Sequence, residues 1–575
     1  MKFIFSYLRP YRVRVFILMI VKALGTMADL ILPFLLAYMI NQIIPSATRE
    51  NIESLYVIGG IMLAVSIVGW LCNVRANRQA EYVTSFAVRD IRNDLFRKVE
   101  GLTATQVDEL TTSSLVSRMT TDTYNLYSFF GMVQRLGIRA PLLLVGGIVM
   151  AFVMDPILAL IMVALLPFIS YVTIRYTKKG QPLFHNIQVQ VDNLIRTLRE
   201  NITGVRVVRA LSMVEFEKER FDAENNETVR RELKATVLMS KIRPFVDIIM
   251  NLGLVLVLLV GAYRIYNEHT EIGYIIALIT YFTLILNAMM SVTRIFIQTS
   301  RASASSKRIK EVIDMKNTMT SGNADMIEDD SKPHLAFEDV SFSYHDGEYH
   351  IENISFELYK GQTLGIIGAT GSGKSTIINL LLRFYDPQEG MIKIYGEDIK
   401  EIDLSKLRSH MGLVLQSDLI FSETIYENIQ FSRAEILTEE VELAAEIAQA
   451  NFVKDLEAGY EHRLSQRGTN ISGGQRQRLL IARALAGKPK LLVLDDASSA
   501  LDYQTDMKLR QAINQQLDET TKIIIAQRIS SIKDAHLILL IEDGKVVACG
   551  THQDLMNSSK QYQILAEHQL GKELE

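Results

Sequence analysis

The sequence predicts an α-helical membrane domain of six spans with long cytoplasmic extensions, followed by an α/β domain. The chain has 575 residues, which is too many for one hydrophobic core because domains hold roughly 100–200 residues. Long apolar runs fill residues 1–300, whereas later residues alternate strand-like runs with glycine loops and helix-like runs. We therefore expect a transmembrane domain over residues 1–314, a linker over 315–333 and an α/β domain over 334–575.

The composition excludes several other classes of protein. Hydrophobic residues make up 48% of the chain and charged residues 22%, so the chain is not intrinsically disordered. The 61 basic and 65 acidic residues give a net charge of −4, which provides no positive field for nucleic acid. The two cysteines, Cys72 and Cys549, lie far apart, so neither a disulfide framework nor a cysteine metal site is expected.

Six apolar stretches predict the membrane spans, because a helix needs roughly 20 apolar residues to cross about 30 Å of hydrocarbon. Asp155-Pro156, between the third and fourth stretches, predicts a tight turn. Long polar segments with helical spacing of apolar residues follow the second and fourth, so these spans should continue as helices into the cytosol. The stretches lie near Val13–Ile44, Leu55–Val74, Leu136–Met154, Ile157–Ile174, Phe245–Ile265 and Ile272–Ile295.

Basic residues orient the predicted spans, because Lys and Arg concentrate in the cytoplasmic segments beside a membrane. Segments 75–135 and 175–241 are rich in them, whereas 45–54 contains only Arg49 and 266–271 contains none. We therefore expect a multi-pass protein of the cell membrane whose two termini and α/β domain are cytoplasmic.

The first predicted span contains two charged residues, Lys22 and Asp29. A charge at membrane depth is costly, so it indicates either a function or an internal partner. One hypothesis is that Asp29 faces a cavity and binds a cationic substrate or carries a proton. The alternative is an internal ion pair of Asp29 with Lys22 or Arg139. The sequence leaves both open.

A glycine-rich loop is the first motif in the α/β domain that indicates phosphate binding. A strand-like run at Thr363–Ile367 leads into Gly368-Ala369-Thr370-Gly371-Ser372-Gly373-Lys374-Ser375-Thr376 and then into an apolar helix. This spacing matches the P-loop pattern, in which glycines free backbone N–H groups to wrap phosphate oxygens at a helix N-terminus. Lys374 should reach the terminal phosphates and Ser375 should ligate Mg²⁺. The predicted cofactors are therefore ATP and Mg²⁺.

Two further motifs fit a nucleotide site. Lys490–Asp496 is an apolar strand that ends in two carboxylates, Asp495 and Asp496, and an acidic residue at such a strand end can hold Mg²⁺. Ser472-Gly473-Gly474-Gln475 opens a helix, and a helix N-terminus is a favourable place for an anion.

Together these features cover the whole chain, which resembles a half-transporter of the ABC exporter family with the type IV fold. The resemblance implies that two ATPase domains pair head to tail, so that each nucleotide lies between one chain's P-loop and the other chain's signature motif. It implies coupling helices near Ser113–Arg118 and Ala210–Glu215. It assigns adenine stacking to Tyr344, phosphate contacts to Gly368, Thr370, Gly371, Ser372, Gly373, Lys374, Ser375 and Thr376, magnesium to Ser375, Gln416 and Asp495, the signature to Ser472, Gly473, Gly474 and Gln475, and the D-loop to Asp502.

Two positions depart from the family pattern. Where such ATPases place a glutamate that polarises the attacking water, this chain has Asp496, whose carboxylate is one methylene shorter. Where they place a switch histidine, this chain has Gln527, which cannot carry a proton or a charge. Loss of a general base costs about 10²–10⁴ in rate. We therefore expect the site on this chain's own P-loop to bind ATP and to hydrolyse it poorly.

The signature at Ser472–Gln475 is intact, so the chain is equipped to complete the active site of a partner. This asymmetry predicts a heterodimer with a second, non-identical half, as in bacterial heterodimeric multidrug exporters. By resemblance, the expected function is ATP-driven export of hydrophobic or amphipathic compounds through the lipid bilayer, with no nucleic acid partner. The alternatives are a lipid or peptide exporter half and a regulatory membrane protein gated by ATP binding.

Overall fold

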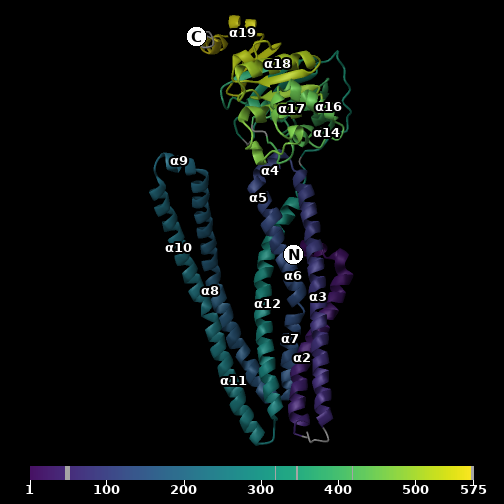
Figure 1. Ribbon diagram of the computed structural model, residues 1–575, viewed down its shortest axis with the longest axis vertical. Coiled ribbons are helices and arrows are strands. Elements are labelled where there is room, and N and C mark those ends of the chain that lie inside the picture. The colour runs from purple at the N-terminus through teal and green to yellow at the C-terminus, as the bar shows by residue number, and fades with distance from the viewer. Residues whose placement is uncertain (46–51, 318, 345–346, 417–418, 571–575) are drawn as a thin grey trace. The chain divides into compact units, whose positions relative to one another are not determined.

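The computed structural model describes residues 1–45, 52–317, 319–344, 347–416 and 419–570, and the chain divides into two compact units (Figure 1). The membrane unit consists of Met1–Glu100 and Ser113–Met315. The C-terminal unit consists of Gly101–Thr112 and Lys316–Glu575.

The described residues of the membrane unit form helices and no strand. Short π-helical turns interrupt them at η2 (Met39–Ile43) and η3 (Arg118–Asp122), and a 3₁₀ turn, η1 (Arg9–Tyr11), precedes the first long helix. The helices are α1 (Lys2–Ser6), α2 (Arg12–Tyr38), α3 (Ile52–Glu100), α5 (Thr112–Ser117), α6 (Thr123–Leu136), α7 (Arg139–Met154), α8 (Pro156–Thr203), α9 (Val205–Ala210), α10 (Val214–Ser240), α11 (Ile242–Tyr266) and α12 (Ile272–Ile313).

Within the described residues, six helical stretches are long and apolar enough to cross a membrane, which confirms the predicted number. They extend well beyond the hydrocarbon layer: the 49 residues of α3 span about 74 Å at 1.5 Å per residue, against about 30 Å of hydrocarbon. Figure 1 shows α10 and α11 following α8, while α2, α3, α6 and α12 pack together. The stretches are Arg9–Ile43, Glu53–Glu100, Thr112–Met154, Pro156–Thr203, Val214–Tyr266 and Ile272–Ile313.

Small residues let α2 and α3 approach each other closely. A Cβ atom added to Gly25 would lie 3.1 Å from the Cβ of Cys72, and one added to Gly69 would lie 3.0 Å from the Cβ of Ala28. Because lipid tails are as apolar as the helices, close van der Waals packing between small residues is what favours helix association in a membrane.

The predicted turn at Asp155-Pro156 is present and caps a helix. The Asp155 side chain accepts hydrogen bonds from the backbone N–H groups of Ile157 at 3.0 Å and Leu158 at 3.1 Å, at the start of α8. It also pairs with Arg264 of α11 at 3.0 Å. The cap satisfies donors that have no partner inside the helix, and the ion pair attaches α11 to the same turn.

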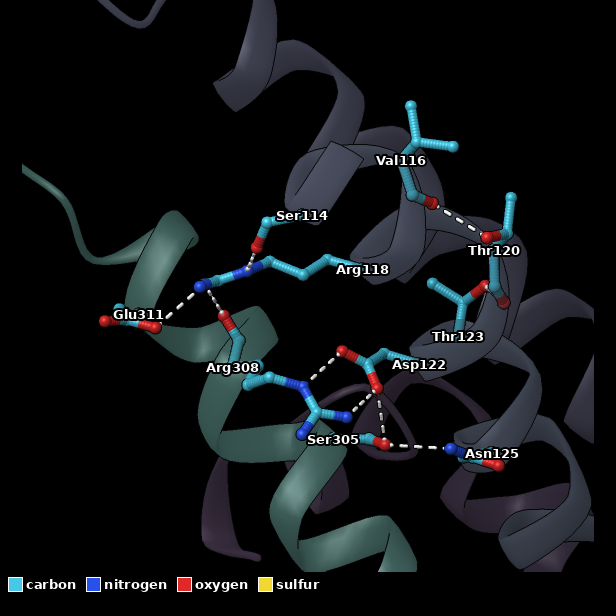
Figure 2. A network of polar contacts seen from close by, with 10 residues as sticks. All are labelled: Ser114, Val116, Arg118, Thr120, Asp122, Thr123, Asn125, Ser305, Arg308 and Glu311. Carbon is cyan, nitrogen blue, oxygen red and sulfur yellow. Dashed lines mark hydrogen bonds and ion pairs between the residues drawn. The ribbon is translucent and has the colours of Figure 1, made fainter. Parts of the chain in front are cut away.

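A network of polar contacts ties η3 to α12 (Figure 2). The Asp122 side chain is buried, and its carboxylate accepts hydrogen bonds from Ser305 Oγ at 2.8 Å and Arg308 Nε at 2.7 Å. Arg118, also buried, donates to the carbonyl oxygen of Arg308 at 2.6 Å and pairs with Glu311 at 2.8 Å. A buried carboxylate needs such donors because desolvation without them is costly. The network therefore fixes the end of α12 against the turn before α6.

Replacing Asp122 should destabilise the membrane unit. Asp122→Ala removes the acceptor of Ser305 and Arg308, and hydrogen bonds to charged groups contribute about 1.5–3 kcal/mol. We expect the unfolding free energy to fall by about 2–3 kcal/mol on this basis, measured as a lower midpoint of thermal unfolding in detergent. Glu311→Gln is the matched control, because its side chain is 56% exposed and a glutamine oxygen can still accept the hydrogen bond from Arg118, so a smaller loss is expected. Equal losses for the two variants would contradict the assignment.

The described residues of the C-terminal unit form two sheets. One is antiparallel, in the order β2-β1-β4-β5, and the other runs β10-β9-β3-β8-β7-β6 with parallel pairing from β9 to β6. The strands are β1 (Leu335–Phe342), β2 (Ile351–Leu358), β3 (Thr363–Gly368), β4 (Glu389–Ile394), β5 (Glu397–Asp398), β6 (Met411–Val414), β7 (Leu491–Asp495), β8 (Thr521–Ile525), β9 (Leu537–Glu542) and β10 (Lys545–Gly550).

Helices cover the parallel sheet, and its central strands are almost fully buried, as a sheet covered on both faces requires. All five residues of β7 are buried. Because β3, β8 and β7 are neighbours, the loops that leave their carboxyl ends meet at one edge, where ligands of such sheets bind. The helices are α13 (Lys374–Leu381), α14 (Leu404–Ser409), α15 (Ile425–Gln430), α16 (Thr438–Ile447), α17 (Gly473–Leu485), α18 (Tyr503–Gln516), α19 (His552–Ser558) and α20 (Lys560–Leu570).

A short helix from the first part of the chain, α4 (Ala104–Leu110), belongs to the C-terminal unit. Gln106 of α4 donates to the carbonyl oxygen of Lys316 at 2.7 Å, and Asp108 accepts a hydrogen bond from the Tyr385 hydroxyl at 2.6 Å. The predicted coupling stretch Ser113–Arg118 begins directly after the segment Gly101–Thr112. It belongs to the membrane unit and forms most of α5 and the first residue of η3.

Candidate functional site

The loop between β3 and α13 forms a cradle closed by its own lysine. Gly371 and Gly373 have φ angles of 87° and 99°, in the left-handed region that favours glycine. The Lys374 ammonium donates to the carbonyl oxygens of Gly368 at 3.0 Å and Ala369 at 2.6 Å. Burial lowers the pKa of Lys374. A phosphate group would supply a charged partner to this ammonium.

Two carboxylates stand opposite this loop, at the end of β7. Ser375 Oγ donates to Asp495 Oδ2 at 3.1 Å, so the predicted hydroxyl and carboxylate ligands of a metal ion lie together. Burial raises the pKa of both Asp495 and Asp496. The site therefore holds desolvated charges of both signs, an arrangement suited to a phosphate chain with a divalent cation.

The two residues that depart from the expected pattern are in contact with each other. Gln527 Nε2 donates to Asp496 Oδ2 at 3.1 Å. Asp496 has a φ of 51°, a strained conformation for a residue other than glycine. The Gln527 amide therefore holds the Asp496 carboxylate at the edge of the site and occupies one of the two carboxylate oxygens with a hydrogen bond.

These groups line one cavity of about 910 Å³. Two of the predicted phosphate-binding residues do not line this cavity: the Ser372 side chain is buried, and Gly368 is the last residue of β3. Several lining residues were not predicted from the sequence, among them Tyr349 and His350, which follow Tyr344 closely and carry no motif of their own. The predicted residues that line the cavity are Thr370, Gly371, Gly373, Lys374, Ser375, Thr376, Gln416, Asp495, Asp496 and Gln527.

The signature segment forms the N-terminal cap of α17. Ser472 Oγ accepts a hydrogen bond from the backbone N–H of Gln475 at 3.2 Å, and the Gln475 side chain accepts one from the backbone N–H of Ser472 at 2.8 Å. This reciprocal cap fixes the first turn. Gly473 and Gly474 are the first residues of the helix, and their small size leaves the helix N-terminus open to an anion.

Comparison with known proteins agrees with this geometry. Residues 15–289 match the family described as the ABC transporter transmembrane region, and residues 351–499 match the family described as ABC transporter. YfiB of Bacillus subtilis, an uncharacterized ABC transporter ATP-binding protein, is 32% identical over 570 residues, which cover 99% of this chain and 98% of the relative. The chain belongs to the ABC transporter family.

A second relative and a solved structure are also similar to this chain over nearly its whole length. YgaD of Bacillus subtilis, a putative multidrug export ATP-binding/permease protein, is 29% identical over 573 residues, 98% of each chain. The solved structure of a bacterial Atm1-family ABC exporter with ATP bound superimposes with a TM-score of 0.80 at 23% identity, covering 98% of each chain. The chain therefore has the ABC exporter fold.

The family membership fixes what the two units are. The membrane unit makes this chain a multi-pass membrane protein, and the C-terminal unit is an ABC ATPase domain, the kind of ATP-binding domain that couples ATP hydrolysis to transport. One membrane domain with one ATPase domain is half of an ABC transporter, which is expected to form a dimer.

The tyrosine expected to stack on adenine is held by other contacts in this ABC ATPase domain. The Tyr344 hydroxyl accepts a hydrogen bond from Asn379 at 2.9 Å and donates to Thr376 at 3.4 Å. Its ring packs edge-on against Tyr385 and His350, with centroids 5.0 and 5.1 Å apart. Tyr344 is not among the described residues that line the cavity, so its stacking role stays a prediction.

A glutamine that the sequence did not single out links the three ATPase motifs. Gln477 of α17 donates to the carbonyl oxygen of Asp496 at 3.1 Å and accepts a hydrogen bond from the backbone N–H of Ala500 at 2.8 Å. Asp502, the residue predicted for the D-loop, caps α18 and accepts from the backbone N–H of Thr505 at 3.0 Å. The signature helix, the carboxylates and the D-loop are therefore joined within one chain.

In the membrane unit of this transporter, Asp29 forms an ion pair. Arg139 donates to Asp29 Oδ2 at 3.1 Å. Lys22 instead donates to the side-chain oxygens of Asn73 and Asn77, each at 3.0 Å. Of the two internal partners left open by the sequence, the structure therefore pairs Asp29 with Arg139. The Asp29 side chain is 26% exposed, so it keeps access to the surface of the unit.

Proposed function

We propose that this chain is the half of a heterodimeric ABC exporter whose own nucleotide site is impaired, and that the assembly exports hydrophobic or amphipathic compounds. The observation that supports the proposal is the Gln527–Asp496 hydrogen bond beside an intact signature cap. The relative YgaD is described as a putative multidrug export ATP-binding/permease protein, which supports this choice of substrate class. The assembly would place the protein in the cell membrane, with both termini and the ATPase domain in the cytoplasm.

Magnesium fits the ligand set of this site. The Ser375 hydroxyl, the Asp495 carboxylate and the Gln416 side-chain oxygen are hard oxygen ligands of the kind that Mg²⁺ prefers, and the first two are in contact. When bound with ATP, Mg²⁺ supplies charge neutralisation to the β- and γ-phosphates. Lys374 and the backbone N–H groups at the start of α13 bind and orient the phosphates.

Weak hydrolysis at this site follows from Asp496 and Gln527. A general base must reach the attacking water, and the Asp496 side chain is short and shares one oxygen with the Gln527 amide. Gln527 can neither accept a proton at neutral pH nor contribute a positive charge toward the γ-phosphate. The phosphate-binding residues are retained, so the site should hold ATP for long periods between turnovers.

The test is ATP hydrolysis by the full-length chain, purified alone and co-purified with a candidate second half-transporter. We expect little activity alone and robust activity in the complex, because a homodimer would contain two impaired sites. The Lys374→Ala variant of the same preparation sets the background. Robust hydrolysis by a homodimer, verified by mass photometry, would rule out the proposal, and strong ATP binding without transport in either preparation would favour an ATP-gated regulator.

A separate prediction concerns the role of Asp29 in substrate choice. Asp29→Asn keeps the volume and removes the charge, so a role in binding cations predicts reduced export of cationic dyes and unchanged export of neutral dyes and basal hydrolysis. If Asp29 serves only to neutralise Arg139, the same change leaves that cation unpaired and both dyes lose transport, together with a lower melting temperature. Paired dye-efflux assays and a thermal-unfolding scan separate these results.

A further inference from the structure

We propose a second ligand site in the ATPase domain, a pocket for a small phosphate-class oxyanion between α18, β8 and the segment that follows β8. A cavity of about 300 Å³ lies there, a volume at the lower end of the range of small-molecule sites. None of its lining residues lines the nucleotide cavity. Its polar lining includes Arg510, Lys522, Ser530, Ser531, Lys533 and Asp534.

The first observation is a lysine whose stem is buried and whose ammonium group faces the cavity. Lys522 of β8 is only 4% exposed, lies beside Thr363 of β3 in the sheet and lines the cavity. Among the described residues, none forms a hydrogen bond or an ion pair with its ammonium group. The stem of the side chain is buried, its ammonium group reaches the cavity, and burial lowers its pKa. An anion in the cavity would give this ammonium group a charged acceptor.

The second observation is a set of donors around the same space. Arg510 pairs with Asp506 at 2.9 Å and donates to the carbonyl oxygen of Ser530, yet its Nε is buried without a partner. Ser530 and Ser531 are each 9% exposed, and in the described part of the chain their hydroxyl groups have no hydrogen-bond partner. Arg and Ser side chains of this kind commonly bind phosphate oxygens.

The charge balance of the pocket favours an anion. Three cationic side chains line it, Arg510, Lys522 and Lys533, against one carboxylate among the described lining residues, Asp534. Asp506, which contacts Arg510 from the side of α18, and Asp518, whose charge acts on Lys522, do not line the cavity. The charges that face the cavity itself are therefore mainly positive, and this favours an oxyanion there.

The position of the pocket connects it to the catalytic loops. Asp502 of the D-loop caps the first turn of α18, and Ser530 follows three residues after Gln527. An oxyanion that contacts Lys522, Arg510 and Ser530 would hold these two segments together. We therefore infer that the site senses free phosphate or a small phosphate monoester in the compartment that contains the ATPase domain.

The experiment measures binding of inorganic phosphate to the full-length transporter by equilibrium dialysis, at constant ionic strength and with saturating ADP in the nucleotide cavity. We expect saturable binding that Lys522→Met weakens at least tenfold. Lys508→Met, on α18 but outside the cavity, is the matched control and should bind as the parent does. Binding should also persist in Lys374→Ala, which removes phosphate contacts from the nucleotide loop. Glycerol phosphate run in parallel identifies the source: tighter binding of the ester indicates a phosphorylated metabolite.

Thermal unfolding keeps the proposal falsifiable if Lys522→Met alters the fold. Without phosphate the variant should melt near the parent's temperature, because methionine keeps the buried stem and removes a charged group that pairs with no described residue. Phosphate should then raise the melting temperature of the parent and of Lys508→Met but not that of Lys522→Met. Ser530→Ala, which retains Lys522, should show an intermediate shift. No saturable binding to the parent, or equal phosphate shifts in the parent and Lys522→Met, would overturn the proposal.

Discussion

Ser472→Ala is expected to lower ATP turnover of the assembled transporter by about 10²–10³, the usual effect of losing one donor to a reacting phosphate or oxyanion. In the proposed heterodimer, Ser472 faces the nucleotide that is bound to the partner's P-loop, where hydrolysis occurs. Asp496→Ala in the same complex should change turnover by no more than about twofold, because a residue that is already poor as a base has little catalysis to lose. Steady-state hydrolysis at saturating ATP measures both.

The control separates chemistry from folding. Ser472 also caps α17, and loss of a serine cap costs about 1 kcal/mol of stability. Ser472→Thr keeps a hydroxyl that can cap, so it should retain most of the activity, while melting temperatures show whether Ser472→Ala has only weakened the helix. If Asp496→Ala proved as inactive as Ser472→Ala, the impaired site would have been assigned to the wrong P-loop.

The parts of the ATPase site that could be predicted are those whose contacts are local in sequence. The P-loop is nine consecutive residues between a strand and a helix, and the signature cap joins Ser472 to Gln475 three residues later. Gln477 could not be found in this way. Its partners, Asp496 and Ala500, lie 19 and 23 residues away, and they meet it only because β7 and the loop after it return to α17.

In the membrane unit, too, contacts between residues far apart in the sequence could not be predicted. Its six spans were predictable because the hydrocarbon layer sets a length and a composition. The partner of Asp29 was not predictable, since Lys22 lies two turns away on the same helix while Arg139 is 110 residues distant. Which cation pairs with the carboxylate depends on the acceptors that α3 offers, and Asn73 and Asn77 bind Lys22.

Restoring both altered positions should convert this chain into an active ATPase by itself. We expect Asp496→Glu combined with Gln527→His to raise the turnover of the chain purified alone by about 10²–10⁴, the contribution of a positioned general base. The longer glutamate reaches farther toward the attacking water, and the histidine replaces an amide that now occupies one oxygen of Asp496.

The single changes should gain much less than the product of their effects would suggest. In Asp496→Glu the Gln527 amide remains free to bind the new carboxylate, and in Gln527→His the carboxylate remains too short. Residues in contact are expected to be coupled rather than additive, so a double-mutant cycle on the turnover number should show a positive interaction between them. Adding Lys374→Ala to the double variant should abolish the gain, because the phosphates would no longer be held. A double variant no more active than the parent would mean that something other than these two side chains limits hydrolysis at this site.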